Sequence, residues 1–215
     1  MSTPTPTPSG NRTQTQEKPI RVSDDPLEFR QFYFNYAKYH YNPTNKLIHL
    51  IFIPQIIFTI WALLHYAPSY TFVVSNYEVT IDISLVVITI VSMIFSLVDT
   101  LIAFGCLTGG LTLYFISLYL YVNDEEIFGG NHLKVMLAIH IVSWIFQFIG
   151  HGIFEKRAPA LSENVFLLFL APFFVILEVL HFFFGYRDKE IKETNIIIAK
   201  EIEQFRRLKK AKASQ

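Results

Sequence analysis

Apolar residues fill long, almost uninterrupted stretches of this chain. Five such runs cover roughly residues 47–64, 83–98, 100–122, 133–153 and 165–184. A helix needs about 20 mostly apolar residues to cross the hydrocarbon core of a bilayer. The runs at 100–122 and 165–184 reach that length comfortably, whereas 83–98 is short. The pattern predicts an all-α fold, a polytopic membrane helical bundle.

The two ends of the chain differ from this apolar middle. Residues 1–25 are rich in proline, threonine and serine and are predicted to be a disordered tail, because such a composition cannot bury a core. Residues 26–187 would form the membrane-embedded domain, which opens with an amphipathic helix over "DDPLEFRQFYFNYAKYH". Residues 188–215 are predicted to be a charged cytoplasmic helix that ends in a basic cluster.

Basic residues gather at the flanks of the apolar middle. Hydrophobic residues make up 52% of the 215 positions and charged residues 17%, and the net charge is zero. Six of the 18 Lys and Arg residues precede residue 47, and nine follow residue 184. Because cationic segments stay on the cytoplasmic side, both termini and the Lys156–Arg157 pair are predicted to be cytoplasmic. The zero net charge gives no electrostatic footprint for a nucleic-acid partner.

Two cytoplasmic termini require an even number of membrane crossings. We therefore expect four membrane segments, with the run 165–184 doubling back or lying in the interface, and a fifth only if that run crosses fully. Pro172 interrupts this run, and Glu178 and His181 lie within it. The glycosylation sequon at Asn11 would need a lumenal N-terminus, so we expect it to be unused.

Small residues interrupt the third apolar run. The stretch "GCLTGG", residues 105–110, predicts close helix packing or a local break. Cys106 is the only cysteine of the chain, which excludes an intramolecular disulfide and a thiolate metal cage.

Polar side chains mark one face of the fourth apolar run. At about 100° per residue, His140, Trp144, Gln147 and His151 fall in a single narrow stripe. Glu155 lies one turn beyond His151, so both side chains could reach one atom at the end of the helix. This pattern is not that of a surface facing lipid.

The stretch "YHYNPTNKLIHLIFIP" brings further polar groups to the start of the first apolar run. Pro43 disfavours helix at Asn42 and suits the first turn of a new helix, with Asn42 as its cap. This break would let His40 fold back toward Asn45 and His49, which share one helical face. The predicted topology places this end of the first run beside the end of the fourth.

Imidazoles and a carboxylate without cysteine suit a borderline metal such as Fe(II), with positions left open for substrate and dioxygen. The candidate metal ligands are His40, His49, His151 and Glu155, with His140 and Glu178 as further candidates. Asn42, Asn45 and Gln147 would fix the ligand tautomers by hydrogen bonds. His140 lies eleven residues from His151, about 16 Å along a helix, which is too far to share one ion. Histidines at a membrane edge can also be simple hydrogen-bonded interface residues.

Three segments together resemble a known family. "HYNPTNKLIHLIFIP", "WIFQFIGHGIFEKRAPAL" and "LAPFFVILEVLHFFFGYR" are similar to segments of the 2-hydroxy fatty acid dioxygenases of the endoplasmic reticulum membrane. The resemblance covers residues 29–187, and the three motifs occur in the same order.

The resemblance implies an Fe(II)-dependent enzyme that uses O2 to convert a long-chain 2-hydroxy fatty acid to the acid one carbon shorter and CO2. His40, His49 and His151 would take the metal-binding role of the family, whereas Glu155 as a ligand is an inference from helical spacing. Lys156 and Arg157 are positioned to bind the substrate carboxylate, or serve only to set topology.

Two other classes of function fit parts of the pattern. One is a non-enzymatic, lipid-binding membrane scaffold. The other is a transporter in which Asp99, His140 and Glu178 line a path, although that class predicts an internal repeat and none is convincing here.

Overall fold

The computed structural model describes residues 20–155 and 169–213, and over these the chain is mainly helical. The helices are α1 (Phe29–Ala37), α2 (Pro43–Leu64), α3 (Ile83–Ser96), α4 (Thr100–Val122), α5 (Asp124–Phe128), α6 (His132–Ile149), the π-helix η1 (Gly150–Glu155), α8 (Ala171–Phe184) and α9 (Asp188–Ala213). Two strands, β1 (Tyr70–Val74) and β2 (Tyr77–Ile81), form an antiparallel hairpin. The expected helical membrane bundle is confirmed.

Three helices of the described residues are long and apolar enough to cross a membrane, namely α2, α4 and the continuous stretch His132–Glu155. Helices α3 and α8 are apolar but shorter, with 14 residues each. The run 165–184 was expected to reach full span length; its first four residues lie outside the described part of the chain, and helix α8 begins at Ala171. Pro172 explains this start, because proline fits the first turn of a helix but not its interior.

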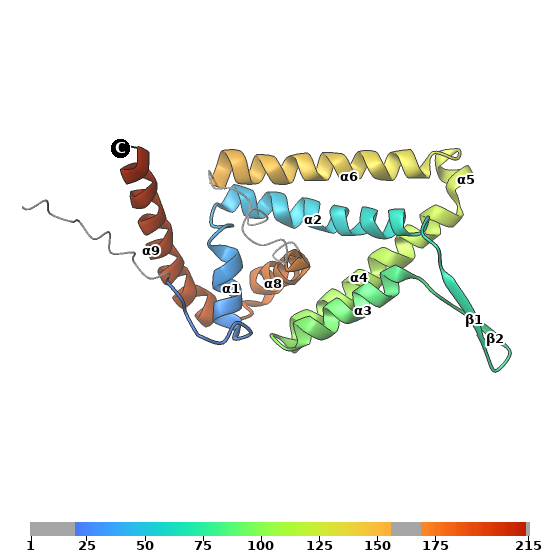
Figure 1. Ribbon diagram of the computed structural model, residues 1–215, viewed down its shortest axis with the longest axis horizontal. Helices are drawn as coiled ribbons and strands as arrows, with labels where there is room; N and C mark the ends of the chain where they lie inside the picture. Colours follow the sequence, from blue (N-terminus) through green and yellow to red (C-terminus); the bar gives the residue numbers. More distant parts are fainter. Residues whose placement is uncertain (1–19, 156–168, 214–215) are drawn as a thin grey trace, which may run out of the picture.

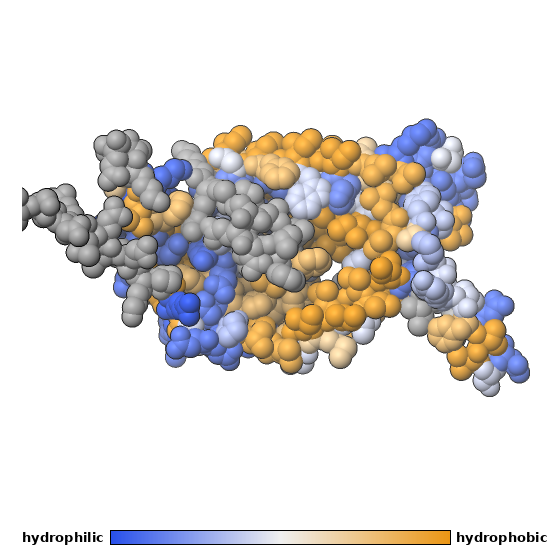
Figure 2. All heavy atoms as spheres, viewed as in Figure 1, coloured by the Kyte–Doolittle hydropathy of each residue, from blue (hydrophilic) through white to orange (hydrophobic). Residues whose placement is uncertain are grey.

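The helices cross the molecule in alternating directions (Figure 1). Helix α2 packs beside α6, and α3 packs beside α4 as a second antiparallel pair. Helices α1, α8 and α9 gather at one end, and the hairpin β1–β2 and α5 lie at the other. Hydrophobic side chains cover much of the surface over the long helices, as Figure 2 shows. Because α1 and α9 lie at the same end of the bundle, the beginning and end of the described chain lie there as well.

The hairpin was not expected from the sequence. Ser75 and Asn76 form its turn with φ of 47° and 71°, a backbone conformation that asparagine tolerates better than most residues. Thr71 and Thr80 pair across the strands, with their Oγ1 atoms 2.9 Å apart. The signal was present as the alternation in "YTFVVSNYEVTI", but the surrounding apolar runs concealed it.

An aromatic core joins α1 to α8 and α9. Its largest members include Tyr33, Phe34, Phe173 and Phe174, each no more than 1% exposed. Ile20 and Val22, which precede α1, also pack against this core. Because α1 rests on helices from the far end of the chain, the turn that follows it is held in place.

A buried ion pair locks the turn between α3 and α4. Asp99 caps α4 by accepting from the N–H groups of Leu101 and Ile102, and the Nη2 atom of Arg187 lies 2.7 Å from its Oδ2 atom. The Tyr186 hydroxyl also donates to Asp99. Asp99, which the transporter interpretation placed on a path, thus ties the α3–α4 turn to the junction of α8 and α9.

Candidate metal centre

His40 lies just beyond α1 and is fixed on both sides of its ring. Its Nδ1 atom is 2.9 Å from the main-chain oxygen of Tyr36. The Tyr36 ring stacks on the imidazole with centroids 3.8 Å apart, and Phe174 of α8 stacks on the other face of Tyr36 at 3.7 Å. The aromatic core therefore sets the position of this imidazole.

The break between α1 and α2 follows the local rules of the sequence. The Asn42 side chain caps α2 by accepting from the N–H groups of Thr44 and Asn45, and Pro43 occupies the first helical position. One turn later, His49 places its Nδ1 atom 2.9 Å from the main-chain oxygen of Asn45. The cap thus starts the helix in the register that points His49 inward.

His151 reaches the same place from the end of α6, where the helix widens into η1. Such π-helical turns are rare and often occur at functional sites. A Cβ atom added to Gly150 would collide with Asn45 Oδ1, so the glycine permits the close approach of the two helices. His151 Nδ1 is buried and has no hydrogen-bond partner among the described residues.

The three imidazoles converge in a buried cluster. Their ring centroids form a triangle with sides of 4.4, 4.8 and 4.9 Å, and His40, His49 and His151 are 6%, 5% and 7% exposed. One ligand atom from each lies within 4.8 Å of those of the other two. Burial and the neighbouring imidazoles lower the pKa of His40 well below its usual value, which keeps it in the neutral form that binds metals.

The ring tautomers show why this cluster suits a cation. His40 and His49 each direct Nδ1 at a main-chain oxygen, and an oxygen can only accept, so each Nδ1 carries the proton. The Nε2 lone pairs then face each other at 3.2 Å with no proton between them. A metal ion among the three rings would satisfy both lone pairs, so the donor set fits a metal.

The carboxylate of Glu155 lies beside the cluster but serves the backbone. Its Oε1 atom accepts from the N–H of Tyr41 and its Oε2 atom from the N–H of Asn42, both at 2.9 Å. The Asn45 side-chain amide lies 3.4 Å from the same Oε2 atom. The converging ligand atoms of the described residues are those of the three histidines alone. Glu155 thereby joins the end of η1 to the turn before α2.

Two side-chain amides close to the histidines have unused hydrogen-bonding atoms. Gln147, one turn before His151, is 4% exposed, and neither its Oε1 nor its Nε2 atom has a partner among the described residues. Asn45 Oδ1 is also buried without a partner. Buried polar groups are costly when unpaired, so these atoms indicate a place where a ligand or water completes the structure.

The two further candidate ligands have partners elsewhere. Trp144 of the same helix donates to Nε2 of His140 at 3.0 Å, and Nδ1 of His140 lies 2.8 Å from the hydroxyl of Thr59 on α2, so both ring nitrogens are engaged. Glu178 pairs with Lys46 at 2.8 Å. The expected carboxylate-binding residues Lys156 and Arg157 lie outside the described part of the chain.

Sequence reasoning missed two residues that shape the site. Tyr36 supplies both the oxygen and the stacking ring that hold His40, and its position four residues before His40 was the available signal. Gly150 was passed over because a single glycine beside a histidine has no specific pattern.

Comparisons with known proteins identify the family of the chain. A family model described as "2-hydroxy-palmitic acid dioxygenase Mpo1-like" matches residues 27–183. The chain is 34% identical over 181 residues to "2-hydroxy-palmitic acid dioxygenase MPO1" of Saccharomyces cerevisiae, a match that covers 79% of this chain and 94% of the relative. No solved structure shows a significant match to the chain.

Proposed function

The chain belongs to the Mpo1-like family, and on that premise we propose that it is an Fe(II)-dependent dioxygenase acting on long-chain 2-hydroxy fatty acids. The observation that carries the proposal is the pair of imidazole lone pairs that face each other at 3.2 Å beside a third buried histidine. The relative named 2-hydroxy-palmitic acid dioxygenase supports the substrate class. The ligands would be His40, His49 and His151.

The proposed reaction balances without an external reductant. A 2-hydroxy acid and O2 give the acid one carbon shorter, CO2 and water, as the C1–C2 bond breaks. C2 rises from the alcohol to the carboxylic acid level and C1 leaves as CO2, which together supply the four electrons that O2 accepts. A redox-active iron would supply the electron transfer between substrate and dioxygen. Histidine ligation is typical of such non-haem iron sites.

The residues around the histidines would bind and orient the substrate. Three protein ligands leave room for exogenous ligands, and a 2-hydroxy acid offers two oxygens on adjacent carbons. The unpaired carboxamide of Gln147 can donate to one of these oxygens and accept from a hydroxyl. Asn42 and Asn45 hold the start of α2, and Lys156 and Arg157 are proposed to attract the carboxylate. The low exposure of the cluster would keep bulk water from the reacting carbon.

The histidine arrangement favours an enzyme over a scaffold. A scaffold needs its polar groups satisfied by one another, whereas here lone pairs and amides are buried unsatisfied around one point. The transporter interpretation loses support, because Asp99, His140 and Glu178 are each engaged in contacts between helices. We further propose that the protein resides in the endoplasmic reticulum membrane, with both termini cytoplasmic.

The reaction is tested with purified, iron-loaded protein and 2-hydroxy palmitate labelled at C1. We expect labelled CO2 and the shortened acid to form only when O2 is present, with little turnover of palmitate or 3-hydroxy palmitate. A site built around the 2-hydroxyl group loses a strong interaction when that group is missing or displaced. Equal turnover without O2, or no turnover of any 2-hydroxy acid by protein that holds iron, would refute the proposal.

A further inference from the structure

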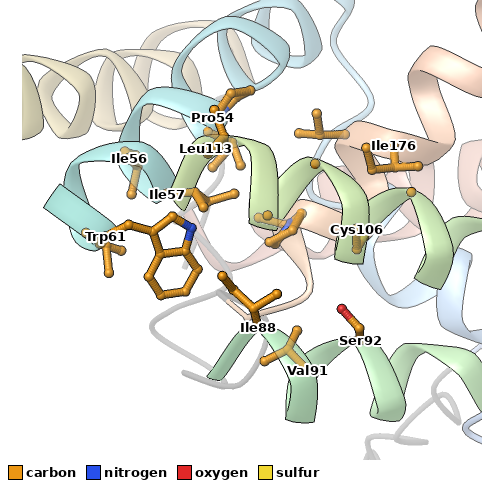
Figure 3. Close-up of a pocket in the computed structure, with 18 of the residues that line it drawn as sticks. Pro54, Ile56, Ile57, Trp61, Ile88, Val91, Ser92, Cys106, Leu113 and Ile176 are labelled. Atoms are coloured by element: carbon orange, nitrogen blue, oxygen red, sulfur yellow. The ribbon is translucent and has the colours of Figure 1, made fainter. Parts of the chain in front are cut away.

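A large, half-open apolar cavity lies between the helices of the bundle and begins one helical turn beyond His49 along α2. It has a volume of about 830 Å³ and is lined by residues of α2, α3, α4 and α8, with Trp144 from α6. Figure 3 shows Trp61, Ile88 and Cys106 around this space, contributed by three different helices. The volume lies within the about 300–1,000 Å³ range of small-molecule sites.

The lining of the cavity selects a hydrocarbon occupant. Its side chains are almost all aliphatic or aromatic, and its few polar groups are the hydroxyls of Ser92, Thr108 and Thr112, the Cys106 thiol and the indole N–H groups of Trp61 and Trp144. The hydroxyls of Thr108 and Thr112 donate to main-chain oxygens of their own helix, so they offer little to a polar ligand. An apolar cavity stays dry and takes apolar ligands.

The position of the cavity along α2 and α6 relates a bound hydrocarbon to the proposed reaction. Ile53 of α2 lines the cavity one helical turn beyond His49, and Trp144 lines it two turns before His151. Trp61, also on the lining, lies twelve residues beyond His49, which is about 18 Å along the helix. This length is comparable with the roughly 15 Å depth of one leaflet, half of the hydrocarbon core, and so with the length of a long acyl chain.

We infer that this cavity binds the acyl tail of the substrate, with the carboxylate end at the histidines and the methyl end near Trp61. The inference rests on the proposed function, since it is the 2-hydroxy acid that must place its C1–C2 bond at the cluster. The tail then lies along α2 between α3, α4 and α8, and the length of the cavity limits the chain length that is accepted.

A larger side chain at Gly109 of α4 should shorten the space that the cavity offers to the acyl chain. Gly109 lines the cavity, and a Cβ atom added to it would meet no atom within 4 Å. At Gly105, by contrast, an added Cβ atom would lie only 2.7 Å from Ile176 Cγ2, so this glycine serves the close packing of α4 against α8 that the small residues predicted. Because the first atom of a side chain at position 109 has room, we expect a leucine there to extend into the cavity.

Binding is measured without any reaction. The chain has two tryptophans, Trp61 and Trp144, and both line the cavity, so intrinsic fluorescence reports its occupancy. Palmitic acid brominated near the methyl end should quench Trp61 in a Trp144→Phe protein, and palmitic acid brominated at mid-chain should quench Trp144 in a Trp61→Phe protein. Excess unlabelled palmitate should relieve both effects. Quenching by a brominated phospholipid that palmitate does not displace would assign the cavity to bulk lipid and overturn the inference.

Chain-length selection supplies the second measurement. With Gly109→Leu, the ratio of turnover of 2-hydroxy palmitate to 2-hydroxy laurate should fall at least about tenfold, because each methylene without room costs about that much. Gly109→Ala should give a smaller shift. Thr89→Leu adds the same kind of bulk at an exposed, non-lining position of α3 and should leave the ratio unchanged.

The outcomes separate this inference from the proposed function. One outcome is that the protein consumes 2-hydroxy palmitate, while neither bromopalmitate quenches tryptophan fluorescence and Gly109→Leu keeps the wild-type turnover ratio. In that case the reaction stands, but the cavity is not the acyl site. If bromopalmitate quenches and is displaced by palmitate while no 2-hydroxy acid is consumed, the reaction fails and the cavity stands as an acyl site. Thermal unfolding of each variant shows that the fold is retained.

Discussion

His40 and His49 turn their Nε2 atoms toward each other across 3.2 Å, although both rings direct Nδ1 at a main-chain oxygen. Two neutral imidazoles in these tautomers cannot bond to each other, so the contact is repulsive unless a cation lies between them. The protein maintains it with a tyrosine stacked on the His40 ring and a hydrogen bond from His49 to the main-chain oxygen of Asn45. Local packing thus holds the two proposed ligands in place.

Replacing His40, His49 or His151 by alanine should cut metal affinity by more than about 100-fold, because even residues behind the ligands contribute up to that much. Elemental analysis of the purified variants, with activity measured in parallel, checks this. The control is His140→Gln, which changes a histidine engaged on both ring nitrogens and should retain the metal. Wild-type metal content in the His151→Ala protein would be incompatible with the proposed centre.

Removal of the metal should abolish turnover and lower the stability of the protein. Chelated protein should lose activity and unfold at a lower temperature, because a bound metal stabilises the native state by mass action. Activity should return with Fe(II) and not with Zn(II), which has no redox chemistry. Full activity in protein from which chelation has removed all metal would argue against a metalloenzyme.

Glu155→Gln distinguishes a carboxylate that positions the backbone from one that binds metal. The structure has Glu155 accepting from the N–H groups of Tyr41 and Asn42, so the amide should weaken metal binding by about 10–100-fold without abolishing it. Loss of charge-assisted hydrogen bonds should also destabilise the protein by about 1.5–3 kcal/mol. Metal titration and thermal unfolding report the two effects. Complete loss of metal with unchanged stability would make Glu155 a ligand.

Gly150→Ala should disrupt the approach of η1 to α2, since the new methyl group would overlap Asn45 Oδ1. We expect a loss of stability of about 1–3 kcal/mol and a large loss of metal binding. Gly152→Ala is the matched control in the same π-helix, because its Cβ meets no atom within 4 Å. Similar behaviour of the two variants would show that close packing at Gly150 is unimportant.

Asp99→Ala should be among the most destabilising single changes. The Asp99 side chain is 1% exposed and accepts hydrogen bonds from the start of α4, from Tyr186 and from Arg187, and loss of hydrogen bonds to a charged group costs about 1.5–3 kcal/mol. The exposed pair of Asp188 and Lys192 provides the control, with an expected cost below about 1 kcal/mol. Thermal unfolding in detergent compares the two. Equal shifts in the unfolding temperature would mean that the Asp99 contact contributes little.

Topology can be tested with glycosylation sites. If both tails are cytoplasmic, Asn11 stays unmodified, whereas Glu78→Thr creates the acceptor sequence at Asn76 in the hairpin at the opposite end of the bundle. The modification of Asn76, and not Asn11, in microsomes is the expected result, read as a shift in gel mobility. Efficient glycosylation of native Asn11 would reverse the proposed orientation.

Local sequence rules determined the elements of this fold. Long apolar runs can satisfy their backbone in a membrane only as helices, so the bundle followed from the pattern alone. The start of α2 followed from Asn42 and Pro43, whose capping and φ preferences act within a few residues. The hairpin β1–β2 also has a local sequence pattern, an alternation of residues that lies between two long apolar runs.

Only the tertiary structure decided how the site is built. Helical spacing could place His40, His49 and His151 near one membrane face, but not set their rings, because His40 takes its position from Tyr36 and Phe174, residues 138 positions apart in the chain. Spacing also predicted Glu155 as a ligand, and only the packing of η1 against the turn before α2 shows that its oxygens accept from main-chain amides. The sequence determines which side chains are available to the site. Contacts between distant segments determine which of their atoms meet, because these contacts depend on tertiary packing and not on local sequence rules.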